Sequence, residues 1–322
     1  MRRLWPVALL LFAFAGPADA ANGCSFQVTG ATWTLEADCT TDSPIGVPDG
    51  FTLDGAQHTI TAMDPPGGRF RGGIIVADGA SATVINTVIT ALMLAEDCQI
   101  GRDRLRAIYF DGASGAIRGN TILNVSRSGS SCQDGNGIEI RNTNRDGRSS
   151  TVEIIDNVVE GFQKTGIVAS GRVDATVRGN RIGASAAQRL LVANGIQAGA
   201  GAHALIEENT VAGNSWGGED AAGTAILLVN TAPGTEVRGN VIAGNADVGI
   251  YILADDVRVE RNRLTDSGTD GAFDVGIGNY GQHNVFEGNS ISGFYIPYQN
   301  VTEPPSPTTV AAYPSKDLLR PN

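Results

Sequence analysis

Short apolar segments recur along the chain, and an asparagine follows each at a similar place. The segments usually open with Gly-Ile, and their alternating apolar positions are typical of strands rather than helices. Clusters of Gly, Asn, Asp and Ser between them are typical of turns. Each asparagine stands two residues before Val, Ile or Leu; the set is Asn86, Asn120, Asn157, Asn180, Asn209, Asn240, Asn262 and Asn289. Subtraction of their numbers gives spacings of 22 to 37 residues.

This repeat predicts a parallel β-helix in which each turn of the chain is one rung. A ring of ~20–30 residues cannot bury its apolar side alone, whereas stacked rings share a core and pair strands ~4.8 Å apart. We expect an all-β solenoid, a single-stranded right-handed parallel β-helix of about 8–10 rungs over residues 21–300. The asparagines are interpreted as structural, because they can stack into a ladder and supply left-handed corner conformations.

The repeats and the segment that leads into them resemble a known superfamily. That segment, residues 47–60, reads VPDGFTLDGAQHTI. Over roughly residues 26–298 the chain resembles the right-handed parallel β-helix, or pectin-lyase-like, superfamily, which contains lyases, hydrolases, epimerases and adhesins. The Gly-His-Gly and Arg-x-Lys motifs of its polygalacturonase-like hydrolases are absent, and Asp255-Asp256 is a weak match to their paired aspartates. The resemblance therefore implies a fold without naming one activity.

The two ends of the chain differ from the repeats. Arg2 and Arg3 precede an apolar stretch, residues 4–15, that is too short to span a bilayer, and Ala18-Asp-Ala20 fits a cleavage site. We therefore predict a signal peptide over residues 1–20, a secreted or periplasmic protein, and no membrane insertion. Residues 301–322 are rich in proline and predict a tail or a covering segment.

Four cysteines in an exported chain predict two disulfides. Three pairings are open, and we favour Cys24–Cys39 with Cys98–Cys132. The first would hold the N-terminal edge of the stack, where an open coil exposes unpaired strands. The second would hold a long loop, residues 126–136, to the previous rung.

The charge and the acidic turns bear on partners and cofactors. The chain has 34 acidic and 23 basic residues, a formal net charge of −11. This disfavours nucleic acid and anionic membranes, and also a bare acidic polysaccharide unless cations bridge the two. Calcium is the candidate cofactor, with Asp134-Gly-Asn-Gly and Asn144-Arg-Asp-Gly as the best oxygen-rich stretches, although ordinary turns explain both. No histidine has a partner at metal-ligand spacing.

Candidate catalytic chemistry lies on the outward face of the Gly-Ile strands. A residue between two inward side chains points outward, which selects Tyr109 and Asp111 on one rung and Glu139 and Arg141 on the next. We predict Asp111 and Glu139 as an acid/base pair assisted by Arg141, with Tyr109 and Gln197 binding substrate. Carboxyls ~5–5.5 Å apart would suit a retaining glycosidase and ~6.5–9.5 Å an inverting one. The alternative is a surface ion pair worth ~0–1 kcal/mol.

Two functions are consistent with these patterns. The first is an exported protein that binds a polysaccharide and, as an enzyme, would cleave it as a lyase or hydrolase. The alternative is a non-catalytic surface, adhesion or structural protein whose outward apolar strip contacts a protein partner. That strip comprises Val168, Leu227, Val229 and Leu253. Insertions after the asparagine strands should gather on one side and build the binding face; they are residues 126–136, 143–150, 184–194, 213–223 and 266–274.

Overall fold

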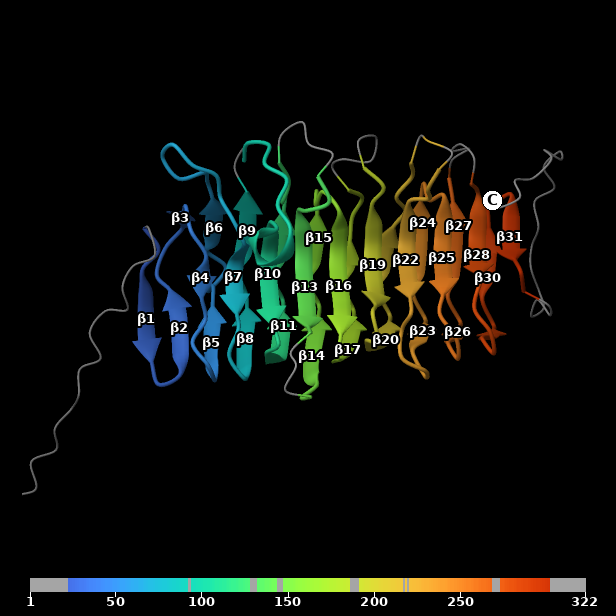
Figure 1. The fold of residues 1–322 in the computed structure, drawn as a ribbon, viewed down its shortest axis with the longest axis horizontal. Coiled ribbons are helices and arrows are strands. Elements are labelled where there is room, and N and C mark those ends of the chain that lie inside the picture. Colours follow the sequence, from blue (N-terminus) through green and yellow to red (C-terminus); the bar gives the residue numbers. More distant parts are fainter. Residues whose placement is uncertain are drawn as a thin grey trace, which may run out of the picture.

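The computed structural model is an elongated stack of short strands (Figure 1). It describes residues 23–91, 94–127, 132–143, 147–185, 191–216, 218, 220–267 and 273–301. The predicted signal peptide and residues 302–322 of the proline-rich segment lie outside the described residues. No helix within the described ranges is long and apolar enough to cross a membrane.

Each turn of the chain contributes one strand to each of three sheets, here called A, B and C. Sheet A contains β1 (Phe26–Thr29), β2 (Thr32–Leu35), β5 (Phe51–Asp54), β8 (Ser81–Ile85), β11 (Ser114–Arg118), β14 (Ser150–Ile155), β17 (Val173–Arg178), β20 (His203–Glu207), β23 (Glu236–Arg238), β26 (Arg258–Glu260) and β29 (Val285–Glu287). Sheet B contains β3 (Cys39–Thr41), β6 (Thr59–Ala62), β9 (Val88–Ala91), β12 (Thr121–Leu123), β15 (Val158–Glu160), β18 (Arg181–Ile182), β21 (Thr210–Ala212), β24 (Val241–Gly244), β27 (Arg263–Asp266) and β30 (Ser290–Ser292). Sheet C contains β4 (Ile45–Gly46), β7 (Gly73–Ala77), β10 (Arg106–Asp111), β13 (Asn136–Asn142), β16 (Thr165–Gly171), β19 (Asn194–Gly199), β22 (Thr224–Val229), β25 (Val248–Leu253), β28 (Val275–Asn279) and β31 (Ile296–Gln299).

The predicted fold is confirmed: the chain forms a right-handed parallel β-helix, and sheets B and C each have 10 strands. Neighbouring strands pair in parallel throughout the described stack except at the N-terminal edge, where β1 pairs antiparallel with β2. This hairpin was not expected from the repeat. It adds a strand beyond the first coil, which moves the exposed edge away from the parallel rungs.

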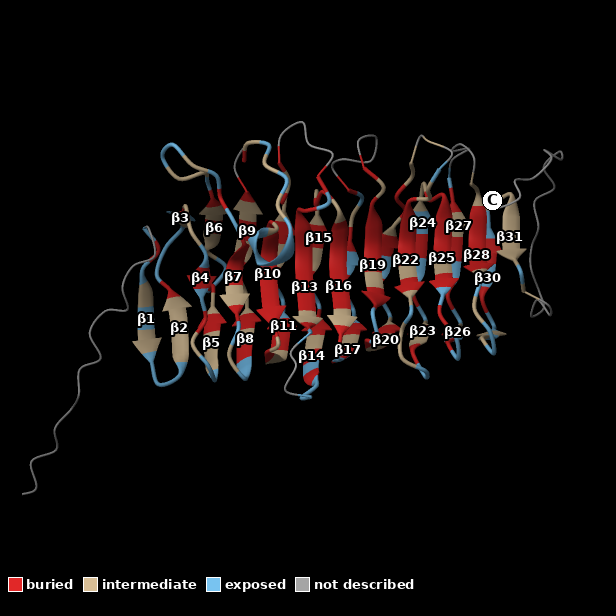
Figure 2. Cartoon of the chain, viewed as in Figure 1, coloured by how far each residue is buried: buried red, intermediate tan, exposed pale blue. Residues whose placement is uncertain are grey.

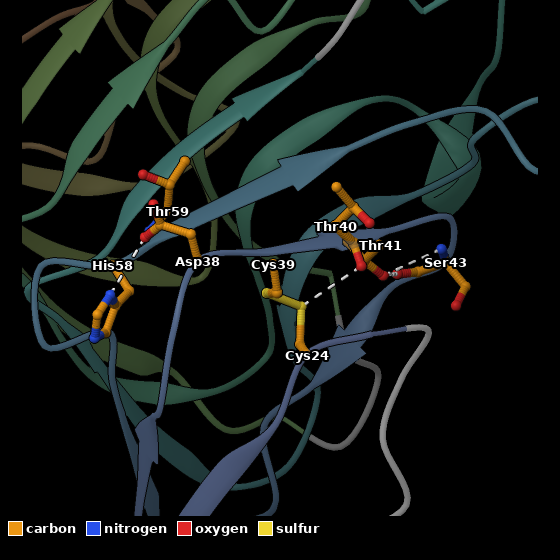
Figure 3. Close-up of a disulfide and its surroundings, with 8 residues drawn as sticks. All are labelled: Cys24, Asp38, Cys39, Thr40, Thr41, Ser43, His58 and Thr59. Carbon is orange, nitrogen blue, oxygen red and sulfur yellow. Dashed lines mark hydrogen bonds and ion pairs between the residues drawn. A yellow bond between two sulfur atoms is a disulfide. The ribbon is translucent and has the colours of Figure 1, made fainter.

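The favoured disulfide at that edge is present. Cys24, just before β1, is bonded to Cys39 in β3 (Figure 3). In the same view Asp38 accepts a hydrogen bond from the backbone N–H of Thr59 at 2.8 Å and faces Nδ1 of His58 at 3.3 Å. The backbone hydrogen bond of Thr59 lowers the pKa of Asp38. His58 thus lies in the turn between β5 and β6 and contacts the corresponding turn of the previous rung.

The core explains the Gly-Ile repeat. Isoleucines stack inward in register along sheet C; they are Ile75, Ile108, Ile138, Ile167, Ile196, Ile226, Ile250 and Ile277. Figure 2 shows buried residues along most of this sheet, from β10 to β28, whereas β31 is half-buried. The preceding glycine leaves space for a neighbouring rung: a Cβ on Gly166 would lie 2.6 Å from the carbonyl oxygen of Gly195. Close approach, rather than an unusual backbone angle, therefore accounts for glycine at this place.

The asparagine ladder is present, with two corrections. From Asn120 to Asn289 each side-chain amide donates to Oδ1 of the next member at 2.9–3.0 Å. The left-handed conformation belongs to the residue before each ladder asparagine, such as Gly179 with φ 65°. Asn86 is not a ladder member, because it has φ 52° itself and Thr87 donates its N–H to Asn120. Register places Val88 opposite Thr121, so the Asn86 motif is displaced by one residue.

Four of the five expected insertions connect sheet B to sheet C; they follow β12, β18, β21 and β27. The fifth, predicted at residues 143–150, was misplaced. It joins β13 to β14 and so runs from sheet C to sheet A. Its residues 144–146 lie outside the described residues. The outer face of sheet C is therefore bordered by the connections between sheets B and C.

Candidate functional site

Sheet C aligns the predicted site residues on neighbouring rungs. In the pairing of β10 with β13, Tyr109 is opposite Glu139 and Asp111 is opposite Arg141. This is the offset expected between Asp111 and Glu139, two residues apart along the strand. Gln197 lies on β19, two rungs beyond Glu139 and opposite Val168 of β16.

A loop covers these outward residues. The segment between β9 and β10 contains a short 3₁₀ helix, η1 (Gly101–Asp103), from which Arg102 reaches the Asp111 carboxylate at 2.6 Å. Consequently the residues that face away from the core are still buried: Tyr109 is 3% exposed, Asp111 7% and Glu139 1%. The sequence pattern showed which way they point but gave no sign of the cover.

Arg106 and Glu139 form a buried ion pair beneath that loop. The guanidinium donates from Nε to Oε2 at 2.6 Å and from Nη2 to Oε1 at 3.2 Å, while Asn136 donates to Oε2 at 2.8 Å. Burial acts to raise the pKa of Glu139, but the hydrogen bond and charge of Arg106, with help from Arg141, hold it below its ordinary value. Glu139 is therefore held ionised, with both oxygens occupied.

Arg106 also organises the loop itself. Its guanidinium donates to the carbonyl oxygens of Gly101, Arg102 and Arg104 at 2.8–3.2 Å. The same group lies 4.1 Å from the centre of the Tyr109 ring, a cation–π contact. Burial, with a smaller contribution from Asp111, raises the pKa of Tyr109 to about 12. Sequence reasoning missed Arg106, because at the first strand position it lies outside the inward–outward alternation that selected the other residues.

A second buried pair and a disulfide hold the loop on its other side. Arg127 donates to Asp134 at 3.1 Å and to the carbonyl oxygen of Phe70 at 2.8 Å. Burial raises the pKa of Asp134, and the Arg127 charge offsets this only in part. The favoured bond between Cys98 and Cys132 is present and joins the connections that precede β10 and β13. The loop is therefore fixed from both ends.

The described residues contain no group of three His, Cys, Asp or Glu side chains that could hold a metal ion. Of the two stretches considered for calcium, Asp134 is engaged by Arg127. The other, residues 144–147, lies outside the described residues apart from Gly147. Calcium stays a prediction from the sequence.

An open groove of about 330 Å³ lies between this loop and the N-terminal rungs of sheet C. Its charged and aromatic lining consists of Arg71, Asp78, Arg102, Asp103, Tyr109 and Asp111. Asp78 directly follows Ala77, which pairs with Phe110, so Asp78 and Asp111 follow equivalent positions on adjacent rungs. The Gly-Ile pattern would align Gly73-Ile74 with Ala107-Ile108, whereas Gly73 pairs with Arg106, a shift of one residue that hides this relation. Aligning Ile75 with Ile108 would have revealed it.

The apolar strip on sheet C differs in part from the expected one. Val168 is only 8% exposed, whereas Leu253 is 36% exposed. Leu227 is opposite Tyr251, and the Tyr251 ring meets that of Tyr280 edge to face at 5.3 Å. A shallow groove of about 610 Å³, lined in part by Leu253, Tyr280 and Asp255, adjoins the strip. The aromatic part of this surface was not predicted.

Comparison with known proteins places the chain in a structural class. Residues 144–302 match the family described as right handed beta helix region. A comparison with curated protein sequences finds no significant match. The chain is a right-handed parallel β-helix repeat protein, as the sequence predicted.

Solved structures are similar to the chain at low sequence identity. The Dettilon tailspike protein is 14% identical with a TM-score of 0.50, covering 81% of this chain and 55% of that one. A double mutant of the periplasmic alginate epimerase AlgG is 15% identical with a TM-score of 0.42, covering 86% and 69%. PfbA, a surface adhesin of Streptococcus pneumoniae, is 12% identical with a TM-score of 0.34, covering 84% of each chain. The chain thus spans about half the length of the tailspike, and the likeness to the tailspike concerns the fold alone.

Proposed function

We propose that this protein is exported and binds an extracellular polysaccharide along the outer face of sheet C. The observation that carries the proposal is the groove in which Arg102 and Asp111 meet beside Tyr109. Guanidinium and carboxylate groups offer several donors and acceptors in fixed directions, which suits the many hydroxyls of a sugar chain. Because the groove opens along the stack of rungs, a linear polymer can lie across successive strands.

Export is supported by the two disulfides. Such bonds persist in oxidising compartments and are rare where thiols are kept reduced. The predicted signal over residues 1–20 agrees with this, and removal of that segment would leave both disulfides intact. We therefore infer a secreted or periplasmic location.

Cleavage of the polymer is the more specific form of the proposal. Asp111 is its acid or base, as the sequence predicted, and Arg141 lies opposite it on the next rung. Glu139 is better suited to positioning, because its oxygens bind Arg106 and Asn136. Asp78 is the alternative partner for Asp111, since strands ~4.8 Å apart can bring two carboxyls close to the ~5–5.5 Å separation of retaining glycosidases.

Binding should be tested first, with the mature protein against a panel of neutral and acidic polysaccharides, by affinity electrophoresis. Asp111→Asn and Arg102→Gln should each weaken retention, whereas Glu153→Gln on sheet A should not. Reducing ends and ultraviolet absorbance of unsaturated ends, measured on the retained polymers, would separate hydrolase from lyase. The proposal fails if no polymer is retained, or if the sheet A control reduces retention as much as the groove variants.

A second function is favoured by the apolar strip. Apolar surface lies on sheet C away from the groove that Arg102 and Asp111 line. It is formed by Leu227, Tyr251, Leu253 and Tyr280, and Tyr280 is 43% exposed. Such a surface suits contact with a protein, as in a non-catalytic adhesion module. The double variant Leu253→Ser with Tyr280→Ser should then abolish retention on a protein-coated surface and leave polysaccharide binding unchanged. The adhesion alternative would be excluded if the variant were retained as well as wild type.

A further inference from the structure

Two cations, Arg104 and Lys164, lie at the same edge of sheet C, two rungs apart. The carbonyl oxygen of Leu105 accepts from the N–H of Gly135 at 2.9 Å, and that of Gly135 accepts from the N–H of Lys164 at 3.2 Å. These contacts place Arg104, directly before Leu105, and Lys164 at the same edge of three successive rungs. Both side chains are half-buried, so they remain open to solvent.

The electrostatics show that the two charges act on each other. Burial lowers the pKa of Lys164 to about 8, and the charge of Arg104 acts in the same direction. Two like charges in a partly desolvated place repel more strongly than they would in water. The native arrangement therefore keeps an unfavourable contact that an anion would relieve.

The neighbouring cations differ because each has a carboxylate. The ion pairs are Arg102–Asp111, Arg106–Glu139, Arg141–Glu139 and Arg127–Asp134. Within the part of the chain that the structure describes, neither Arg104 nor Lys164 forms an ion pair with a carboxylate. This edge of sheet C thus carries local positive charge on a chain whose formal net charge is −11.

The hydrogen-bonding groups at this edge are only partly used. Lys164 Nζ donates to the carbonyl oxygen of Val192 at 2.6 Å, and an ammonium has three donors. Arg104 Nε is buried and has no hydrogen-bond partner among the described residues. Between them, the two side chains retain donors for a group that brings several acceptor oxygens.

We propose that Arg104 and Lys164 bind a carboxylate or sulfate group of an acidic polysaccharide. The inference rests on the proposed function and specifies the class of polymer. Charge-assisted hydrogen bonds to such a group are short and roughly twice as strong as neutral ones. Screening over ~8–10 Å limits the repulsion from the acidic remainder of the surface. At this edge the local charge therefore favours an acidic polysaccharide, although the net charge of the whole chain disfavours one.

The position also fits a polymer that occupies the groove. Arg102 lines the groove, while Arg104, two residues later, acts on Lys164 of the segment before β16. The segment before β10 therefore carries one cation that lines the groove and a second that acts on Lys164. A chain that crosses the loop would place one sugar unit beside Asp111 and an acidic unit beside Lys164.

The lysine content allows a direct test. Of the 23 basic residues other than histidine, two are lysines, Lys164 and Lys316, which leaves 21 arginines by subtraction. Reductive methylation with ¹³C-formaldehyde therefore labels two side chains and the amino terminus for NMR titration. An oligogalacturonate, or a sulfated oligosaccharide in a separate arm, should raise the pKa of Lys164 from about 8 and leave Lys316 unchanged. A neutral dextran oligomer should change neither.

Affinity measurements on variants complete the test. Lys164→Met and Arg104→Gln should each weaken binding of the acidic oligomer about tenfold or more, the equivalent of ~1.4 kcal/mol. Arg118→Gln on sheet A removes the same charge elsewhere and should have little effect. Wild-type affinity for the acidic oligomer should also fall as pH rises through about 8, because Lys164 then loses its proton. Of the nearby carboxyl groups, Glu139 has a pKa below its ordinary value and stays ionised, whereas Asp134, whose pKa burial raises, is paired with Arg127.

The outcomes separate this inference from the proposed function. Equal binding of neutral and acidic oligomers, with no change at Lys164, would overturn the anion site and leave polysaccharide binding intact. An equal shift with inorganic sulfate at the same concentration would overturn its assignment to a polymer. Failure to bind any polysaccharide would overturn both proposals.

Discussion

Arg106 and Glu139 are joined across two rungs by hydrogen bonds of 2.6 and 3.2 Å, and their side chains are 0% and 1% exposed. The pair lies outside the isoleucine core, between sheet C and the loop that carries Arg102. Its role is therefore distinct from that of the core: it holds the wall of the groove against the strands. Because carbonyl oxygens of the loop accept from the same guanidinium, the loop and the ion pair should be lost together.

Glu139→Gln should destabilise the protein by about 3–5 kcal/mol, because it leaves the Arg106 charge buried without a carboxylate. Equilibrium unfolding in urea would measure the loss. The double variant Arg106→Leu with Glu139→Leu should recover only part of it, because it removes the unpaired charge but also the donors to three loop carbonyl oxygens. If the single and double variants were equally destabilised, the pair would not be the cause.

The same pair predicts that the stability of the fold depends on pH. The folded-state pKa of Glu139 lies below its ordinary value of 4.5. The stability that the ionised Glu139 adds to the fold is therefore fully present above pH 4.5. The contribution is lost as pH falls through the lower, folded-state pKa. Melting temperatures of wild type and Glu139→Gln should therefore converge as pH falls below about 4.5. A difference that stayed constant into strong acid would contradict this account.

Asn209→Ala should destabilise by about 1–3 kcal/mol or more, because it removes one ladder side chain and strands its partners. Oδ1 of Asn209 accepts from the backbone and side chain of Asn180, and Nδ2 donates to the carbonyl oxygen of Val177. Asn86→Gly is the matched control, because Asn86 is outside the ladder and glycine tolerates its positive φ. Unfolding experiments should show a clear loss for the first variant and little for the second.

Gly166→Ala should cost about 1–3 kcal/mol by overpacking. The added Cβ would lie 2.6 Å from the carbonyl oxygen of Gly195 and 2.7 Å from Cγ2 of Ile182. Gly46→Ala on β4 is the control, because a Cβ added there would meet nothing within 4 Å and the φ of Gly46 is not positive. Thermal denaturation would compare the two, and equal stability would disprove the close-approach explanation of the Gly-Ile repeat.

The rung architecture could be predicted because it depends on short, repeated spacings. The isoleucines and ladder asparagines each contact the equivalent residue of the next rung, so one unit predicts the others. The sequence aligned Asn86 with the ladder asparagines and was wrong by one residue. Asn86 instead occupies the preceding corner position, whose left-handed conformation accepts Asn as well as Gly. The groove could not be predicted in the same way, since its wall comes from a non-repeated segment. Arg102 belongs to that segment and Arg106 donates to its carbonyl oxygens, and no periodic signal marks either residue.

The disulfides should differ in their effect on binding. Each closes a loop, of 15 residues for Cys24–Cys39 and 34 for Cys98–Cys132, so the chain-entropy model gives each ~3–4 kcal/mol. Only Cys98–Cys132 joins the segment that bears Arg102 and Arg104. The variant Cys98→Ala with Cys132→Ala should therefore weaken polysaccharide binding far more than Cys24→Ala with Cys39→Ala, at a similar loss of melting temperature. Isothermal titration below both melting temperatures would measure this, and equal affinities would show that the groove wall does not need its covalent tie.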